Sequence, residues 1–294
     1  MEWPLLLQPI RLNQKNSSVS NIKENVRSPF LRDVDKILFS SYFRKLQDKT
    51  QVYPLAKNSY VRTRLTHSLE VATVSRSLGN IIGKEIIKKY NLKQNYPNIS
   101  FYDFGYIIQA AALAHDIGNP PFGHKGEAAI CNFYETFFEK LNQTINNSKD
   151  NGLNQQLSSE LKSLNLDNFT KFDGNAQGFR IITTLSSKNN LNGLNLTYPV
   201  LATFCKYPSL VQNKNSIVSK KIGIFTSEAK TFNDIQNKLQ LKINTNNLTT
   251  SRHPLAFLLE AADDICYLVA DSCDAFAVNI LGFNEVTEMF TNIM

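Results

Sequence analysis

The stretch from residue 101 to residue 118, FYDFGYIIQAAALAHDIG, constrains the fold more than any other part of the chain. Nearly all of its side chains are apolar, and their spacing is typical of a helix. A helix that is apolar on all sides is stable only when neighbouring elements cover it. We therefore predict a buried central helix that Gly118 and the following NPP sequence terminate, with other helices packed around it.

Apolar residues at intervals of three and four also dominate the rest of the chain, and alternating strand-like patterns are few. Two stretches rich in Asn, Ser, Lys and Gln, near 142–171 and 211–252, are expected to be polar insertions. The second contains the strand-like run KKIGIFTSE, so the predicted fold class is all-α with at most a short β-hairpin in 211–252. We expect one mostly helical domain over residues 1–294, with helices over 30–47, 64–90, 123–141, 175–185, 253–281 and, broken by Pro208, 199–210.

Composition limits the cellular setting. An apolar content of 42% and a charged content of 19% are typical of a globular protein, and no uninterrupted apolar stretch is long enough to span a bilayer. The first residues, MEWPLLLQPIRLNQK, lack a basic leader and a small-residue cleavage site, so no signal peptide is expected. The four cysteines form no CxxC pair, which fits a reducing environment. A cytoplasmic protein without a membrane partner is therefore expected.

The net charge of +7 suits a polyanionic partner, either nucleic acid or the phosphates of nucleotides. The lysines are, however, interspersed with asparagines throughout the sequence rather than gathered in one stripe. A solvated basic surface without any specific anion is the alternative explanation.

His115 and Asp116 lie at the end of the apolar helix, where adjacent side chains can converge on one ion. An imidazole nitrogen and a carboxylate oxygen suit Mn²⁺, Fe²⁺, Zn²⁺ or Co²⁺, whereas Mg²⁺ prefers oxygen ligands. Two ligands hold a metal weakly, so further ligands must come from other segments. The alternative is a pair that only caps the helix or forms a hydrogen bond.

Three residues elsewhere favour the metal interpretation. His67 lies in the first turn of a predicted helix, and Asp263 and Asp264 interrupt the apolar sequence FLLEAADDICYLVA. A buried carboxylate is costly unless it is paired or binds a cation. The alternative partner is an arginine such as Arg62 or Arg64, in an internal salt bridge.

The last predicted helix carries Asp263, Tyr267 and Asp271 at intervals of four residues. This spacing places all three side chains on one face of the helix. Such a strip on an otherwise apolar helix suits a pocket wall that meets a polar ligand. A solvated stripe on an amphipathic helix is the alternative.

His124 and Glu127 are three residues apart at a predicted helix start, so their side chains face the same way. The carboxylate can orient the imidazole and raise its basicity, and the couple can then hold a water or move a proton. Alternatively, Glu127 only complements the positive end of the helix dipole.

Five blocks in chain order resemble those of the HD-domain deoxynucleotide triphosphohydrolases, and especially of the bacterial deoxyguanosinetriphosphate triphosphohydrolases: RTRLTHSLEV, ALAHDIGNPPFGHKGE, FDGNAQGFRIITTL, LATFCKYP and EAADDICYLVAD. The segment FRKLQDKTQVYPL is also similar to the N-terminal part of that family. The resemblance runs from about Phe30 to the last residue and implies an HD-type helical fold. Family members usually extend past the last helix predicted here, so the usual C-terminal part of the family is expected to be missing.

The resemblance also assigns site residues by position. It implies one divalent ion per site, Mn²⁺, Mg²⁺ or Fe²⁺, and a catalytic pair made of His124 and Glu127. In the substrate site, the ring of Tyr267 would leave no room for a 2′-hydroxyl and Asp271 would accept a hydrogen bond from the 3′-hydroxyl. The implied metal ligands are His67, His115, Asp116 and Asp263. The implied substrate-binding residues are Gln51 and Val52 at sugar and base, Arg64 at a phosphate, Lys206 and Tyr207 at the triphosphate and the reacting region, and Tyr267 and Asp271.

The activity implied by the resemblance is hydrolysis of a deoxynucleoside triphosphate, with dGTP as the expected substrate, to deoxynucleoside and inorganic tripolyphosphate. Such an enzyme would control the dNTP pool as a homo-oligomer, with single-stranded DNA or a nucleotide as a further effector. Two alternatives are another HD phosphohydrolase, namely a nucleotidase or a cyclic-dinucleotide phosphodiesterase, and a nucleotide- or nucleic-acid-binding regulator.

Overall fold

The computed structural model of the chain describes residues 2–12, 27–54, 57–147, 156–161, 164–185, 193–212, 215–216, 219–241, 243–244 and 248–291. Its helices are α1 (Trp3–Leu6), α2 (Pro29–Leu38), α3 (Ser41–Arg44), α4 (Arg64–Lys89), α5 (Leu92–Asn95), α6 (Phe101–Ala114), α7 (Gly123–Asn147), α9 (Asp167–Thr170), α10 (Gly174–Arg180), α11 (Tyr198–Phe204), α12 (Ala229–Leu239), α13 (Pro254–Ala277) and α14 (Phe283–Thr291). Two 3₁₀ turns, η2 (Lys45–Asp48) and η4 (Thr226–Glu228), a π-helical turn, η3 (Ile181–Leu185), and two short strands, β1 (Ile243–Asn244) and β2 (Thr249–Thr250), complete the elements.

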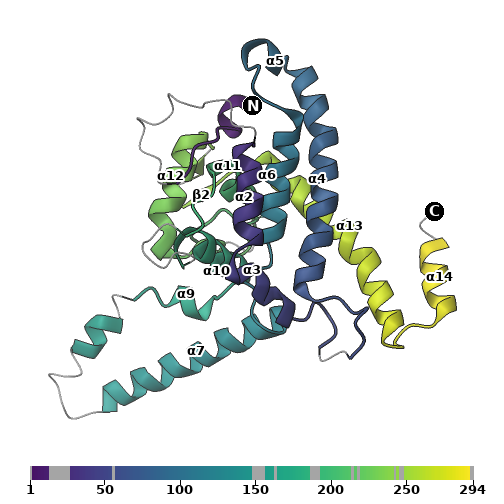
Figure 1. Cartoon of the computed structure of the whole chain (residues 1–294). Coiled ribbons are helices and arrows are strands. Elements are labelled where there is room, and N and C mark those ends of the chain that lie inside the picture. Colours follow the sequence, from purple (N-terminus) through teal and green to yellow (C-terminus); the bar gives the residue numbers. More distant parts are fainter. Residues whose placement is uncertain are drawn as a thin grey trace.

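Helix α6 is the centre of the molecule, as its sequence predicts. It packs against α2, α4, α11 and α13, and Figure 1 shows α2, α6 and α4 side by side. Its start is fixed by Ser100, whose hydroxyl accepts from the backbone of Tyr102, and by Asp103, which accepts from the backbone of Ser100. Because neighbours surround it, every residue from Ala110 to Ala114 is fully or almost fully buried.

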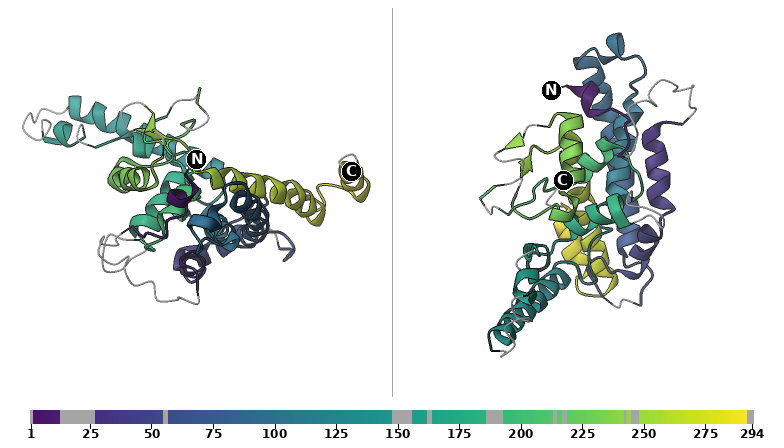
Figure 2. Two further views of the ribbon diagram at one scale, coloured as in Figure 1. Left: turned by 90° about the horizontal axis from the view of Figure 1, so that it is seen from above. Right: turned by 90° about the vertical axis from the view of Figure 1, so that its left-hand side faces the viewer.

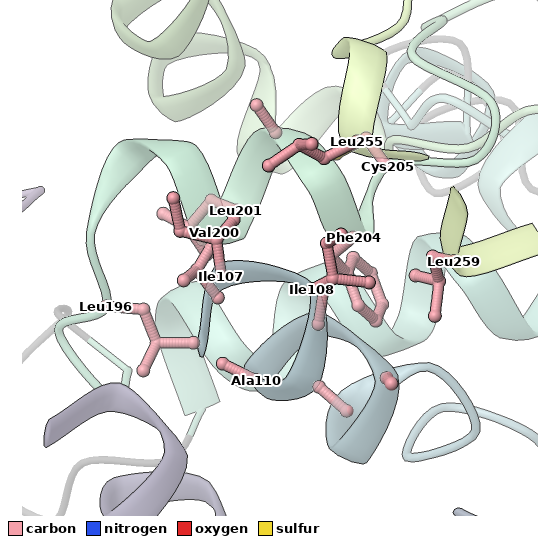
Figure 3. Packing of buried hydrophobic residues seen from close by; sticks show 14 of the residues in the cluster. Ile107, Ile108, Ala110, Leu196, Val200, Leu201, Phe204, Cys205, Leu255 and Leu259 are labelled. Atoms are coloured by element: carbon pink, nitrogen blue, oxygen red, sulfur yellow. The ribbon is translucent and has the colours of Figure 1, made fainter. Parts of the chain in front are cut away.

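The core on one side of α6 is mostly aliphatic. Ile107 and Ile108 of α6 pack against residues of α11 and α13, and Figure 3 shows this contact from close by. On the other side, α6 and α4 come unusually close, because a Cβ atom added at Gly79 would lie only 2.7 Å from the Cα of Gly105. Glycine at this crossing lets the two backbones touch. The labelled partners in Figure 3 include Val200, Leu201, Phe204, Leu255 and Leu259.

The all-α fold class is confirmed, and the only paired strands among the described residues are those of one short hairpin inside 211–252. Its antiparallel register pairs Ile243 with Thr250 and Asn244 with Thr249. The strand-like run at 220–228 is not a strand: Ile222, Ile224 and Phe225 are buried in irregular backbone that leads into η4. Their burial, rather than pairing, explains their apolar character.

Several elements differ in their extent from the sequence expectations. The predicted helix over 30–47 is interrupted after Leu38, because the hydroxyl of Ser40 caps a new helix by accepting from the backbone of Phe43. The predicted polar insertion at 142–171 begins within α7, which continues to Asn147, and contains α9; residues 148–155 and 162–163 of it lie outside the described chain. The predicted insertion at 211–252 contains an additional helix, α12.

Two elements extend away from the central helices. Figures 1 and 2 show α7, with α9 beside it, projecting on one side, and the second half of α13 with α14 on another. In this second half of α13, Leu268, Val269 and Phe276 are exposed, although the sequence is strongly apolar. No helix in the described ranges combines the length and apolarity that a membrane span requires.

Candidate active site

A cavity of about 680 Å³ opens where α4, α6 and α13 meet the loops around residues 119 and 220. Of the predicted site residues, Glu127 lies behind His124, and Val52 is exposed and does not line the cavity. The other predicted site residues all line it: Gln51, Arg64, His67, His115, Asp116, His124, Lys206, Tyr207, Asp263, Tyr267 and Asp271.

The ends of two touching helices bring the first histidines together. His67 is in the first turn of α4, which begins with a capping box formed by Thr63 and Thr66, and His115 is the C-cap residue that directly follows α6. The two imidazole rings are 5.4 Å apart between centroids. Ligand atoms of His67, His115 and Asp116 all lie within 4.8 Å of one another, so the three side chains could hold a metal ion.

The protonation of His115 follows from its neighbours. Its Nδ1 is 2.6 Å from the carbonyl oxygen of Ala112, so Nδ1 carries the proton and donates it. Its Nε2 is then a lone-pair acceptor, buried, with no hydrogen-bond partner in the structure. The nearest charged atoms are carboxylate oxygens, at 3.6 Å on Asp116 and 3.8 Å on Asp263. An acceptor that faces other acceptors fits a site for a cation, with its second nitrogen fixed by a carbonyl as in known metal sites.

Asp263 reaches the same point from α13. Its Oδ1 is 3.0 Å from Nε2 of His67, and its side chain is 30% exposed. Burial alone would raise the pKa of Asp263, but the hydrogen bond with His67 holds it below its usual value. An ionised carboxylate therefore completes a group of two imidazoles and two carboxylates from three helices.

The salt-bridge alternative is realised for Asp116 instead of Asp263. Nη1 of Arg64 lies 2.6 Å from Oδ2 of Asp116, whereas Arg62 pairs with Glu70 and Asp274. Burial would raise the pKa of Asp116, but the charge of Arg64 beside it holds that pKa below its usual value.

The expectation that Asp264 is buried is wrong. Its side chain is exposed, because only Asp263 of the two neighbours lies on the cavity side of α13. The spacing of Asp263, Tyr267 and Asp271 does place all three side chains on the cavity wall, so they do not form a solvated stripe. Burial raises the pKa of Asp271, whose Oδ1 has no hydrogen-bond partner in the structure.

His124 and Glu127 form a hydrogen-bonded pair, with Nδ1 of His124 2.8 Å from Oε2 of Glu127. The side chain of His124 is 86% exposed and that of Glu127 only 10%. Burial would raise the pKa of Glu127, but bonds from His124 and from the backbone N–H of Gly174 at 2.8 Å lower it overall. The ionised Glu127 holds the proton on Nδ1, which leaves Nε2 of His124 available to exchange a proton.

Lysine side chains line another part of the cavity wall. Lys206 lies 3.1 Å from Oε1 of Glu260, and Lys221 lies 2.7 Å from Oδ2 of Asp173. Sequence reasoning missed several lining residues, although the adjacent lysines and the FDGNAQ block were visible as signals. These missed residues are Asn119, Asn175, Lys220, Lys221 and Glu260.

Comparison with known proteins agrees with this geometry. The model of the HD domain matches residues 64–159, a range that includes His67, His115, Asp116 and the pair of His124 and Glu127. A deoxyguanosinetriphosphate triphosphohydrolase-like protein of Synechocystis is 40% identical over 100% of this chain and 64% of its own length. One from Listeria monocytogenes is 38% identical over 100% of the chain and 60% of its own length.

A deoxyguanosinetriphosphate triphosphohydrolase of Yersinia enterocolitica is 35% identical over 87% of this chain and 52% of its own length. The chain therefore spans between about half and two thirds of these curated relatives. The HD match covers the histidine-rich half of the site, and the likeness to the relatives extends over the whole chain, including Asp263 on α13. This chain belongs to the HD-domain family of deoxyguanosinetriphosphate triphosphohydrolase-like proteins.

Proposed function

We propose that the chain hydrolyses deoxynucleoside triphosphates, with dGTP as the expected substrate, to deoxynucleoside and inorganic tripolyphosphate. The main support is one arrangement within a single cavity. The unpartnered Nε2 of His115, Nε2 of His67 and the carboxylates of Asp116 and Asp263 lie close together. The pair of His124 and Glu127 lies beside them, and cationic side chains line the wall. The names of the relatives support the same reaction class.

His67, His115, Asp116 and Asp263 are the residues that would hold one divalent ion, Mn²⁺, Mg²⁺ or Fe²⁺. Such an ion would neutralise charge on the α-phosphate and orient the reacting groups. The unpartnered Nε2 of His115 fits this role, since a buried polar atom without a partner is costly. Nε2 of His67 faces the same point, because it lies 3.0 Å from Oδ1 of Asp263. The two nitrogen donors favour Mn²⁺ or Fe²⁺ over Mg²⁺.

In the proposed reaction, a water oxygen bonds to the α-phosphorus and the bond from that phosphorus to the 5′-oxygen breaks. The water loses a proton and the 5′-oxygen gains one, so a group that exchanges protons is needed. His124 fits this role because Glu127 fixes its tautomer and leaves Nε2 available. Arg64 and Lys206 would offset negative charge on the phosphates.

For the substrate, we propose that Tyr207 lies at the reacting region and that Tyr267 and Asp271 meet the deoxyribose. The unpartnered Oδ1 of Asp271, on the cavity wall, fits a group that accepts a hydrogen bond from a sugar hydroxyl. We propose Gln51 for the contact with the base, because Gln51 lines the cavity and Val52 does not.

The test is incubation of the purified chain with each of the four deoxynucleoside triphosphates and the four ribonucleotides, with Mn²⁺ or Mg²⁺, followed by chromatography. Deoxynucleoside plus tripolyphosphate supports the proposal. Orthophosphate released from a monophosphate would indicate a nucleotidase, and a linear dinucleotide would indicate a cyclic-dinucleotide phosphodiesterase. Nucleotide binding without any product would favour a regulator and contradict the proposal.

The cytoplasmic location, the homo-oligomer and the effector, single-stranded DNA or a nucleotide, belong to the same proposal. Sedimentation of the purified chain tests the oligomer. Binding of single-stranded DNA should weaken steeply as salt increases, because phosphate contacts release counterions. No binding at low salt would remove DNA as an effector.

A further inference from the structure

The block FDGNAQ contains a buried carboxylate that the proposed reaction does not yet use. Asp173 is 3% exposed, and both of its oxygens have partners. Oδ1 accepts from the backbone N–H of Asn175 at 2.8 Å and from the Asn175 side chain at 2.9 Å. Oδ2 lies 2.7 Å from the ammonium of Lys221. One carboxylate thus connects the start of α10 to a lysine of the cavity wall.

The partners of Asp173 surround the catalytic pair. Lys221 is 3.6 Å from Oε2 of Glu127, the oxygen that also bonds to His124. Gly174, next to Asp173, donates its backbone N–H to Oε1 of Glu127. Both oxygens of Glu127 are therefore held by groups that Asp173 places.

The second paired lysine of the cavity, Lys206, offers a comparison. Lys206 is paired with Glu260, but the side chain of Glu260 is 31% exposed and that of Asp173 only 5%. A solvated pair holds its lysine weakly, because water competes for both charges. In the other pair the lysine is similarly exposed, at 31% for Lys221 and 37% for Lys206, but the carboxylate of Asp173 is shielded from water and therefore keeps its partner more firmly. Asp173 is thus the stronger constraint on a cavity lysine.

Building on the proposed hydrolysis, we infer that Asp173 is a positioning residue, which fixes Lys221 and the Gly174 N–H against Glu127 and so holds His124 in place for proton transfer. Asp173 touches no reacting atom and acts through these groups. This role explains two residues of the FDGNAQ block. The carboxylate of Asp173 binds Lys221 and caps α10. Glycine is needed at position 174 because a Cβ atom there would lie 2.9 Å from Oε1 of Glu127.

Asp173→Asn separates the charge from the cap, because an asparagine oxygen can still accept from the backbone of residue 175 at the helix start. Asp173→Ser provides a second capping residue without charge. The matched control is Asp167→Asn, six residues earlier, where an exposed aspartate pairs with exposed Lys171. We expect Asp173→Asn to lower kcat/KM by up to about 100-fold, the scale of a small misplacement of catalytic groups, with little change in Tm. Asp167→Asn should leave both unchanged.

A double-mutant cycle tests whether Asp173 acts through Lys221. If it does, the double variant should have nearly the same kcat/KM as Lys221→Met alone, because Asp173→Asn has little left to disturb once Lys221 is absent. Losses that multiply independently would overturn the inference. So would unchanged kcat/KM in Asp173→Asn, or failure of both the Asn and Ser variants to fold, which would make Asp173 a residue of stability only.

A measurement without substrate separates this inference from the proposed activity. The charges of Asp173 and Glu127 outweigh the effect of burial and hold the pKa of Lys221 above its usual value; Tyr207 is the third titratable group that faces this lysine. The rate of acylation of Lys221, followed by mass spectrometry against pH, should therefore shift to lower pH in Asp173→Asn. Lys220 in the same peptide is the internal control. A wild-type chain without hydrolase activity but with this shift would contradict the proposed function only, whereas no shift would contradict the positioning role.

Discussion

Two buried histidine environments in this molecule differ in one respect. At the start of α13, His253 has partners on both ring nitrogens: Nδ1 accepts from the Leu255 backbone at 3.3 Å and lies 3.1 Å from the Thr203 hydroxyl, and Nε2 donates to the Leu6 carbonyl at 3.1 Å. At the cavity, His67 and His115 each keep one nitrogen without a hydrogen-bond partner. A fully bonded imidazole indicates a structural histidine, whereas the unpartnered Nε2 of His115, which lies beside two carboxylates, indicates a nitrogen that can bind a ligand.

The largest expected effect tests the cavity side of this comparison. His115→Ala removes one of two neutral nitrogen donors, and its backbone partner at Ala112 remains in a helix. We expect the purified variant to retain no stoichiometric divalent metal by elemental analysis and its turnover to fall to background. Asp264→Asn, next to Asp263 but exposed, is the matched control and should retain metal. Full metal content in His115→Ala would remove this residue from the site.

The next effect concerns His124, which is exposed and outside the predicted metal group. His124→Ala should lower kcat roughly 10²- to 10⁴-fold, the usual range for a general acid–base group, while metal content stays at the wild-type level. Steady-state kinetics and elemental analysis on the same preparation distinguish this result from metal loss. Unchanged turnover would exclude a role for His124 in proton transfer.

The buried position of His253 should make the stability of the protein, but not its activity, depend on pH. Burial lowers its pKa from 6.5 to about 4, so between these values the unfolded chain binds a proton that the folded chain does not. The free energy of unfolding should therefore fall by about 3 kcal/mol as the pH drops from 6.5 to 4. Urea denaturation at several pH values measures this slope. His253→Asn keeps a capping side chain that cannot be protonated, so its slope should be shallower; equal slopes would contradict the assignment.

The smallest effect is expected on the outer face of α13. Asp264→Asn should change the free energy of unfolding by no more than about 0.5 kcal/mol, because its side chain is exposed and takes part in no ion pair of the described structure. Thermal or urea denaturation at pH 7 checks this. A large loss of stability would mean that this face is covered and that Asp264 differs less from the cavity-lining Asp263 than the structure indicates.

The sequence was most informative where residue chemistry and helical period coincide. Helices α4, α6 and α13 follow their apolar spacing. His67, His115, Asp116 and Asp263 line the cavity, whereas Asp264, which also interrupts the apolar sequence, is exposed. Helix α12 was missed because only Phe232, Ile235 and Leu239 mark its buried face within a polar stretch, although their spacing of three and four was a usable signal.

The supporting groups were less predictable because they depend on distant contacts. Asp173 and Lys221 are 48 residues apart in sequence (221 − 173), and no local pattern pairs a particular acid with a particular lysine. Glu260 likewise shares its helix with Asp263, but only the fold shows that it faces Lys206. Site residues could be found by their chemistry, whereas the residues that hold them required three-dimensional structure.

The contact between Gly79 and Gly105 has a consequence for the distant site. Twelve residues separate Gly79 from His67 along α4, and ten separate Gly105 from His115 along α6, which correspond to lever arms of about 18 and 15 Å. A tilt of about 3° at the crossing would shift either imidazole by about 1 Å, several times the tolerance of about 0.2 Å for a metal–ligand bond. The lack of side chains at Gly79 and Gly105 therefore helps to fix the distance between His67 and His115, about three helical turns away.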